Sequence, residues 1–111
     1  MKLPYKIVAH RGAREIKSEN SLGSIKEAVK QKADIIEIDV RMTRDREFVI
    51  LHDFFLERTT TGRGFVITKK LSELQHVRLL NGESIPQLEE VLTYMQQHKK
   101  TSLLLDRLIP F

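Results

Sequence analysis

The sequence contains no cysteine and no tryptophan, and aromatic residues make up only 6% of its 111 residues. The absence of cysteine excludes a disulfide-stapled scaffold and any cysteine-ligated zinc site. No stretch approaches the roughly 18–20 consecutive apolar residues of a membrane-spanning helix, and the N-terminal residues lack the apolar core of a secretory signal. We therefore expect a cytoplasmic protein without stable membrane insertion.

Charged residues make up 31% and apolar residues 41% of the chain, a balance typical of a folded globular domain. Lys and Arg outnumber Asp and Glu by 19 to 15. The basic residues are spread along the chain and do not form the cluster that nucleic-acid binding needs, so we predict no nucleic-acid partner. Because the chain has no repeat, linker or low-complexity segment, we interpret residues 1–111 as one domain.

Apolar patterning predicts alternating strands and helices. Helices are expected from Leu22 after the capping residues Asn20 and Ser21, over residues 71–76, and from Pro86 to near Lys99-Lys100. The apolar stripe of the last helix is Leu88, Val91, Leu92 and Met95. The connection between the second and third predicted strands fits either a hairpin or a turn into a parallel neighbour. This order of elements is typical of an α/β protein with a largely parallel sheet. The predicted strands are residues 7–9, 35–40, 48–52 and 102–105.

Each predicted strand begins with apolar residues and finishes with an ionisable group near its carboxyl end. Side chains alternate between the two faces of a strand, so Glu37 and Asp39 share one face while Ile36 and Ile38 occupy the other. Ionisable groups at this end of the strands are how (β/α) barrels and open α/β sheets build their sites. The groups concerned are His10, Glu37, Asp39, His52 and Asp106.

Glu37 and Asp39 interrupt a run of isoleucines, where an unpaired ionised carboxylate would cost several kcal/mol. One interpretation is that they pair with Arg or Lys across the sheet, or that the strand lies at an edge. The other is a cation site, because two carboxylates on one face suit a hard ion such as Mg²⁺ or Ca²⁺. Glu19 fits either a charge at a helix start or a group that supports such a site.

Two histidines and one arginine extend the candidate site. His10 and His52 follow predicted strands, and imidazoles that titrate near neutrality can exchange protons during hydrolysis; a structural role is the alternative for each. Arg11 is suited to hold a phosphoryl oxygen, or else forms a surface ion pair. His76 and His98 have no such neighbours and are interpreted as surface residues.

Taken together, these motifs resemble the glycerophosphodiester phosphodiesterase family from about residue 7 to residue 105. No single motif is specific, but the combination in this order and spacing is. The motifs are His10-Arg11-Gly12, Glu19-Asn20-Ser21, Glu37-Ile38-Asp39-Val40, Leu51-His52-Asp53, Arg58-Thr59-Thr60 with Gly62 and Gly64, and the segment from Ile85 to Leu92.

The resemblance implies the N-terminal half of a TIM-type (β/α)8 barrel with its site at the carboxyl ends of the strands. It implies hydrolysis of glycerophosphodiesters to glycerol 3-phosphate and an alcohol, with a divalent cation, Mg²⁺ or Ca²⁺. Carried over by position, His10 and His52 match the general acid/base pair, Glu37 and Asp39 match metal ligands, and Arg11 matches a phosphate contact.

The sequence departs from the family pattern after the fourth predicted strand, where the family has Glu-Ile-Lys and this chain has Leu105-Asp106-Arg107-Leu108. Asp106 is predicted to replace the third metal ligand with a shorter arm, while the lysine position holds Leu108. A complete barrel takes about 250 residues, so we expect a truncated domain with weak or absent activity and a possible homodimer through open sheet edges. The alternatives are a sphingomyelinase or phospholipase D-like enzyme, and a non-catalytic remnant that binds a phosphate ligand or a partner protein.

Overall fold

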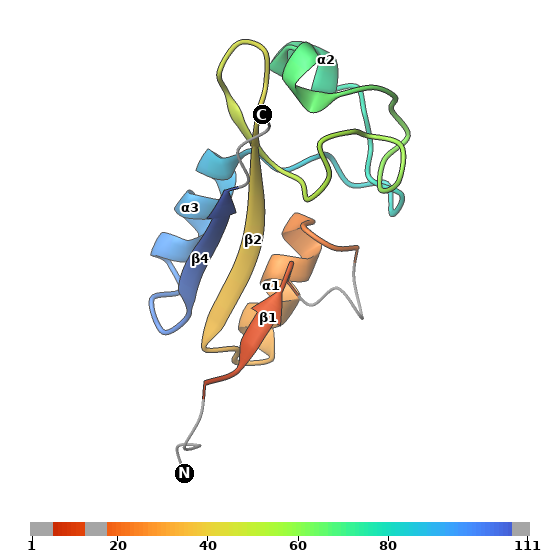
Figure 1. Cartoon of the computed structure of the whole chain (residues 1–111). Helices are drawn as coiled ribbons and strands as arrows, with labels where there is room; N and C mark the ends of the chain where they lie inside the picture. Colours follow the sequence, from red (N-terminus) through yellow and green to blue (C-terminus); the bar gives the residue numbers. More distant parts are fainter. Residues whose placement is uncertain (1–5, 13–17, 108–111) are drawn as a thin grey trace.

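The long strand β2 (Ile35–Met42) organises the sheet, because all the other strands pair with it. Strands β1 (Val8–His10) and β4 (Ser102–Arg107) run parallel to β2 along its opposite edges (Figure 1). Strand β3 (Phe48–Ile50) pairs with the far end of β2 in the antiparallel sense. The prediction of a largely parallel sheet is confirmed for β1, β2 and β4, and β3 is the exception.

The structure is a computed structural model that describes residues 6–12 and 18–107. Its first and second strands match the predicted ones closely, although β2 continues two residues further than expected and β4 also extends to Arg107. The β4 extension lengthens the parallel β2–β4 ladder to the pair Val40 and Arg107. The β2 extension, Arg41 and Met42, pairs with β3.

The connection between β2 and β3 is a hairpin, which decides between the two predicted possibilities. Thr43 donates its backbone N–H to the Glu47 carbonyl at 2.8 Å, and Arg46 takes up the left-handed conformation with φ of 63°. Strand β3 ends at Ile50, two residues earlier than predicted, and beyond it the His52 carbonyl accepts from the Arg41 guanidinium. The hairpin therefore returns the chain to the level of Asp39.

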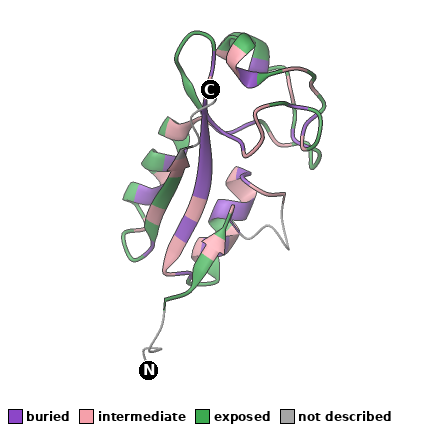
Figure 2. Cartoon of the chain, viewed as in Figure 1, coloured by how far each residue is buried: buried purple, intermediate pink, exposed green. Residues whose placement is uncertain are grey.

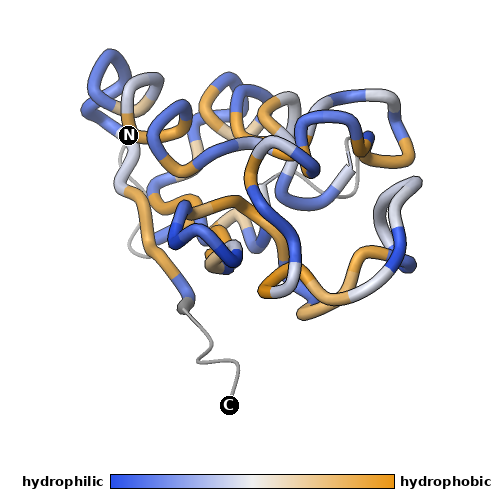
Figure 3. The backbone as a smooth tube through the Cα atoms, turned by 90° about the horizontal axis from the view of Figure 1, so that it is seen from above, coloured by the Kyte–Doolittle hydropathy of each residue, from blue (hydrophilic) through white to orange (hydrophobic). Residues whose placement is uncertain are grey.

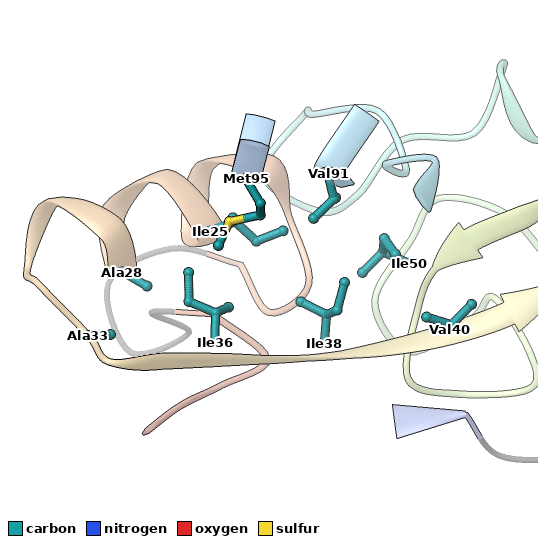
Figure 4. Close-up of a cluster of buried hydrophobic side chains, with 9 residues drawn as sticks. All are labelled: Ile25, Ala28, Ala33, Ile36, Ile38, Val40, Ile50, Val91 and Met95. Atoms are coloured by element: carbon teal, nitrogen blue, oxygen red, sulfur yellow. The ribbon is translucent and has the colours of Figure 1, made fainter. Parts of the chain in front are cut away.

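Helices α1 (Leu22–Lys30) and α3 (Leu88–Gln96) cover one face of β2. The alternating residues of β2 point toward these helices, as the close-up in Figure 4 shows, which confirms the predicted division of its two faces. Helix α1 starts where predicted, since the Ser21 hydroxyl accepts from the Ser24 N–H at 3.0 Å. The core comprises Ile25, Ala28, Ala33, Ile36, Ile38, Val40, Ile50, Val91 and Met95.

Helix α3 begins at Leu88, two residues after the predicted start at Pro86. Gln87 is its N-cap residue, and its backbone N–H is accepted by the Glu90 carboxylate at 3.1 Å. The Pro86 carbonyl instead accepts from Ile50 at 2.9 Å, which joins this segment to β3. Of the predicted apolar stripe, Leu92 is 42% exposed and lies outside the core.

Residues 43–87 form an excursion beyond the carboxyl end of β2, in the upper part of Figure 1. The excursion contains the short 3-10 helix η1 (Val66–Thr68) and helix α2 (Leu71–Leu74), which is shorter than the predicted 71–76. Figure 2 shows that buried residues within it alternate with exposed ones. Its own core consists of Val49, Leu51, Leu56, Val66, Leu74, Leu79 and Ile85. Since β4 pairs directly with β2, the excursion is an insertion between two neighbouring parallel strands.

The other face of the sheet and its β4 edge carry exposed apolar side chains. Val8 is 52% exposed, Leu104 is 50% exposed and Leu105 is 43% exposed. In Figure 3 the hydrophobic stretch of β4, which leads toward the end marked C, lies at the margin of the molecule. Within the described parts of the chain, no helix is both long enough and apolar enough to cross a membrane.

Candidate active site

Three carboxylates meet on the face of the sheet that the helices leave open. Asp39 and Asp106 are register partners in the β2–β4 ladder, and Glu37 precedes Asp39 by two residues on the same face. One oxygen of each lies within 4.8 Å of the other two. The parallel pairing of β2 and β4 thus places together the residues that the sequence singled out as a cation site, and oxygen ligands of this kind suit Mg²⁺ or Ca²⁺.

Asp39 is 1% exposed and is held by partners from the segment before α1. The Asn20 side chain donates Nδ2–H to Asp39 Oδ2 at 2.9 Å and accepts the Asp39 backbone N–H at 3.2 Å. Arg11 Nε lies 3.5 Å from the same Asp39 oxygen. Because a buried carboxylate without partners would cost several kcal/mol, these contacts explain how Asp39 is kept in the apolar strand. The predicted ion pair therefore exists beside the acidic cluster.

The donor set of this cluster fits a divalent cation. Its three carboxylates lie beside the Arg11 guanidinium and the His10 imidazole that contacts Glu37. The buried Arg41 guanidinium is a second cation near them: burial lowers its pKa, and the charges of Asp39 and Asp106 partly offset that effect. Within the described part of the chain, the Asp106 carboxylate makes no hydrogen bond or ion pair. Like charges crowded at such distances repel one another, and a hard cation with carboxylate ligands relieves that repulsion.

His10 reaches the cluster from the last residue of β1. It is the register partner of Glu37, and its Nε2 lies 2.8 Å from Glu37 Oε1. The chain then turns through Arg11 and Gly12, which have φ of 57° and 76°. A Cβ on Gly12 would lie 2.3 Å from the Ser24 hydroxyl, so the turn is packed directly against α1. This close packing requires glycine and places Arg11 next to the carboxylates.

Arg11 bridges two acidic residues. Its Nη1 donates to Glu19 Oε2 at 3.1 Å, and its Nε faces Asp39 without forming a hydrogen bond to any described residue. The side chain is only 15% exposed. The structure therefore shows an arginine that is ion-paired yet retains a buried unpartnered donor beside the acidic cluster.

His52 enters the site from the loop after β3. Its Nδ1 lies 2.8 Å from Asp53 Oδ1, and Asp53 in turn accepts from Arg58 Nε at 2.7 Å and from Arg58 Nη2 at 3.0 Å. The sequence predicted His52 at the end of the third strand and left the direction of that strand relative to β2 open. The structure shows an antiparallel hairpin, which brings the chain back to the level of Asp39 just before His52.

Arg58 also contacts Glu19, with Nη1 to Oε1 at 2.8 Å and Nη2 to Oε2 at 3.0 Å. Burial raises the pKa of Glu19, but the hydrogen bonds and charge of Arg58 outweigh it, so the pKa is lowered overall. Hydrogen bonding to Arg58 likewise lowers the pKa of Asp53, with a further contribution from His52. Both carboxylates are thereby held in the ionised form.

The predicted residues therefore fall into two groups. The first, joined directly, comprises Glu37, Asp39, Asp106, His10 and Arg11. The second is His52, which connects to Arg11 through Asp53, Arg58 and Glu19. No role was predicted for Asp53 or Arg58, which the sequence marks only by their place in the family-like motifs. Leu108, at the family's lysine position, lies outside the described residues.

The remaining histidines lie away from this face. His76 follows α2 and is exposed, and His98 stacks against Tyr94 with a ring-centroid separation of 4.3 Å. Neither joins the cluster of site residues.

Parallel strands covered by helices on one face, with carboxylates and imidazoles converging on the other, define an α/β barrel unit that has its site at the carboxyl ends of the strands. The sequence model of the "Glycerophosphoryl diester phosphodiesterase family" matches residues 10–106. The chain belongs to that family.

Individual relatives agree with this assignment. The chain is 44% identical over 107 residues to YhdW of Bacillus subtilis, and 38% identical over 92 residues to a glycerophosphodiester phosphodiesterase of Caldanaerobacter subterraneus. Among solved structures, a glycerophosphodiester phosphodiesterase from Agrobacterium tumefaciens superposes with a TM-score of 0.86 at 31% identity. An Oleispira antarctica phosphodiesterase in complex with the product sn-glycerol-3-phosphate superposes with a TM-score of 0.87 at 32% identity.

The similarity covers most of this chain but less than half of these relatives. It spans 90% of the chain and 43% of YhdW, and 77% of the chain and 38% of the Caldanaerobacter enzyme. It spans 92% of the chain and 46% of the Agrobacterium structure, and 94% and 44% for the Oleispira structure. The fold is thus the N-terminal half of the family's (β/α) barrel, as predicted.

Proposed function

We propose that the chain carries the metal-binding and proton-transfer residues for hydrolysis of glycerophosphodiesters to glycerol 3-phosphate and an alcohol. The observation that carries the proposal is the convergence of Glu37, Asp39 and Asp106 to within 4.8 Å beside His10 and Arg11. The Oleispira neighbour with its bound sn-glycerol-3-phosphate supports the substrate class. The two alternatives, a choline-lipid phosphodiesterase and a non-catalytic binding remnant, become outcomes of the test.

In this proposal Glu37, Asp39 and Asp106 hold one divalent cation, Mg²⁺ or Ca²⁺. When bound, the cation supplies positive charge for the phosphoryl oxygens as negative charge develops on them. Arg11 orients the phosphoryl group, because its Nε is buried beside the cluster and makes no hydrogen bond within the described chain. A fixed donor at this place stabilises developing charge without reorganisation.

His10 and His52 share the proton transfers. One imidazole takes the proton from a substrate hydroxyl as that oxygen attacks the phosphorus, and the other gives a proton to the departing alcohol oxygen. The cyclic phosphate left on the glycerol is then opened by water, with the two proton transfers reversed. The contact between His52 Nδ1 and Asp53 leaves Nε2 of that ring available for this exchange.

We further propose that the 111-residue chain alone hydrolyses its substrate weakly and forms a homodimer. Val8, Leu104 and Leu105 are at least 43% exposed, and strands with open edges favour pairing with another chain. Sedimentation that gives only a folded monomer at micromolar concentration contradicts the dimer. The cytoplasmic location predicted from the sequence is part of the proposal, and cell fractionation tests it.

The central experiment incubates the purified chain with glycerophosphocholine in Mg²⁺ or in Ca²⁺ and measures glycerol 3-phosphate with a coupled enzyme assay. We expect slow release that EDTA abolishes and that Glu37→Gln abolishes. The matched control is Glu47→Gln, an exposed carboxylate at the β2–β3 hairpin, which should behave as the unaltered chain does.

Two further arms separate the alternatives. Faster cleavage of sphingomyelin or lysophosphatidylcholine than of glycerophosphocholine favours the choline-lipid enzyme. Absence of both hydrolysis and stoichiometric metal binding by calorimetry contradicts the proposed site and favours the remnant. Stoichiometric binding that Glu37→Gln removes, with slow glycerol 3-phosphate release, supports the proposal.

A further inference from the structure

Arg58 makes an unusual set of contacts for a side chain that is 46% exposed. It donates four hydrogen bonds of 2.7–3.0 Å, two to the Glu19 carboxylate and two to the Asp53 carboxylate. Glu19 is separated from Arg58 by 39 positions in the sequence. A guanidinium offers donors in a fixed fork, so it can clamp two carboxylates at once, which a lysine ammonium cannot do with the same geometry.

On one side of this clamp lies His52. Its side chain is 33% exposed, and it sits in a loop after β3 and not within a strand. The contact that fixes its ring is the one from Nδ1 to Asp53 Oδ1, and Asp53 is only 9% exposed. An ionised carboxylate can only accept, so the proton of the neutral imidazole resides on Nδ1.

On the other side of the clamp lies the acidic cluster. Glu19 shares its carboxylate between Arg58 and Arg11, and Arg11 Nε faces Asp39. Charges alternate along this path from Asp39 to Asp53, and Asp53 contacts His52. The site residues come from two separate segments, one between β1 and α1 and the other the loop after β3, and Arg58 connects these segments.

We propose that Arg58 is a positioning residue, which fixes the orientation and tautomer of His52 through Asp53 and ties that histidine to Arg11 through Glu19. The effect of Arg58 on catalysis rests on the proposed phosphodiesterase function. Its effect on the tautomer and ring orientation of His52 does not, because both can be measured in the absence of any hydrolysis. Arg58 makes its hydrogen bonds to the two carboxylates, and the proposed role requires no contact between Arg58 and the substrate.

The geometry explains why such a clamp is needed. Asp53 neighbours His52 in sequence, but this proximity alone does not fix the orientation of its carboxylate toward the imidazole. Two bonds from Arg58 hold both of its oxygens, and Oδ1 then also faces the imidazole. Misplacement of an acid/base group by about 1 Å can lower a rate on the order of 10²-fold.

The test reads the tautomer directly by long-range ¹H–¹⁵N NMR of the imidazole rings in the full chain. The chain has four histidines, and the His52 signals are assigned from the spectrum of His52→Gln. Arg58→Met removes all four hydrogen bonds of the clamp. Arg58→Lys keeps the positive charge but not the paired donors of the guanidinium, and Glu19→Gln weakens only the contact between Arg58 and residue 19. Arg63→Met is the matched control, since Arg63 is exposed in the same loop and makes no side-chain hydrogen bond or ion pair within the described residues.

In the unaltered chain and in Arg63→Met we expect the Nδ1–H tautomer of neutral His52 to predominate. In Arg58→Met we expect it to give way to the Nε2–H form, with Arg58→Lys between the two. Unchanged His52 tautomer in Arg58→Met overturns the inference. If Arg58→Met does not fold, Glu19→Gln decides: a partial shift toward Nε2–H supports the inference, and none overturns it.

Hydrolysis measured on the same samples separates this inference from the proposed function. Where the unaltered chain is active, Arg58→Met should lower kcat on the order of 10²-fold while KM changes far less, because substrate contacts are kept. A shifted tautomer in a chain without any hydrolysis supports the positioning role and counts against the function. Normal hydrolysis with an unchanged tautomer overturns the positioning role alone.

Discussion

The Asn20 side chain makes two hydrogen bonds to Asp39: it donates to the Asp39 carboxylate at 2.9 Å and accepts from the Asp39 backbone N–H at 3.2 Å. Asn20 is 1% exposed and has a left-handed φ of 53°, a conformation that asparagine adopts more readily than most residues. The helix-capping segment that the sequence indicated therefore also stabilises the most buried carboxylate of the site.

Replacing Asn20 by alanine should cost about 1–3 kcal/mol of unfolding free energy, because the buried Asp39 groups lose their partners. Urea unfolding measures this. Asn81→Ala is the control, since Asn81 also donates to and accepts from one residue, Glu83, but on the exposed surface. There the loss should stay within about 0.5 kcal/mol. Equal losses for both variants would show that burial of the Asn20–Asp39 pair contributes nothing.

Gly12→Ala is expected to destabilise the chain by about 2–5 kcal/mol, the sum of left-handed backbone strain and overpacking. The added Cβ would lie 2.3 Å from the Ser24 hydroxyl and 2.9 Å from the Ser24 backbone carbon. Gly82→Ala separates the two causes, because Gly82 has φ of 88° and no atom within 4 Å of its Cβ position. That variant should lose about 1–2 kcal/mol. Urea unfolding that gives the same loss for both would contradict the close packing of the turn on α1.

Much of the fold and the acidic cluster could be predicted, because they follow from short-range patterns. Alternation along β2 separates Ile36 and Ile38 from Glu37 and Asp39, and the core confirms that division. The structure then pairs β4 with β2 in parallel, in a register that the sequence did not specify and that places Asp106 opposite Asp39. The helix starting after Ser21 follows from a local capping signal.

The orientation of β3 and the partners of His52 could not be predicted, because they depend on contacts between distant segments. The turn after β2 fits either strand direction, and the hairpin is decided by packing within residues 43–87. Apart from its place in the family-like motif, nothing in the sequence around Arg58 indicates a role. The role becomes apparent only because the fold brings Glu19 and Asp53 into contact with it. The pattern of apolar and polar residues along a sequence does not reveal ion pairs between distant loops.

Asp106→Asn should weaken binding of Mg²⁺ or Ca²⁺ by roughly tenfold or more, since one of three charged ligands becomes neutral. A bound ion raises stability in proportion to the logarithm of its concentration over Kd, so thermal unfolding with increasing metal measures the change. Glu47→Gln, which removes an exposed carboxylate away from the cluster, should retain the metal-dependent rise in Tm. An unchanged metal dependence in Asp106→Asn would remove this residue from the predicted ligand set.

The stability conferred by the Arg58 clamp should depend on pH in a defined direction. In the folded chain Arg58 lowers the pKa of both Glu19 and Asp53 below their ordinary values, which are about 4.3 and 3.9 in unfolded chains. The folded state therefore binds protons less readily than the unfolded state. The contribution is present in full above about pH 5 and is lost as the pH falls through the lower, folded pKa values.

Comparing the unaltered chain with Arg58→Met isolates this contribution from other acid-sensitive groups. In urea unfolding near pH 7 the unaltered chain should be the more stable of the two, and the difference should shrink as the pH is lowered toward about 2, where protonated Glu19 and Asp53 no longer attract the guanidinium. Because Arg58 is 46% exposed, added salt should also reduce the difference near neutral pH. Arg63→Met should show neither effect. A difference between the two chains that stays constant from neutral to acid pH would mean that Arg58 stabilises the fold through packing of its aliphatic stem and not through the two carboxylates.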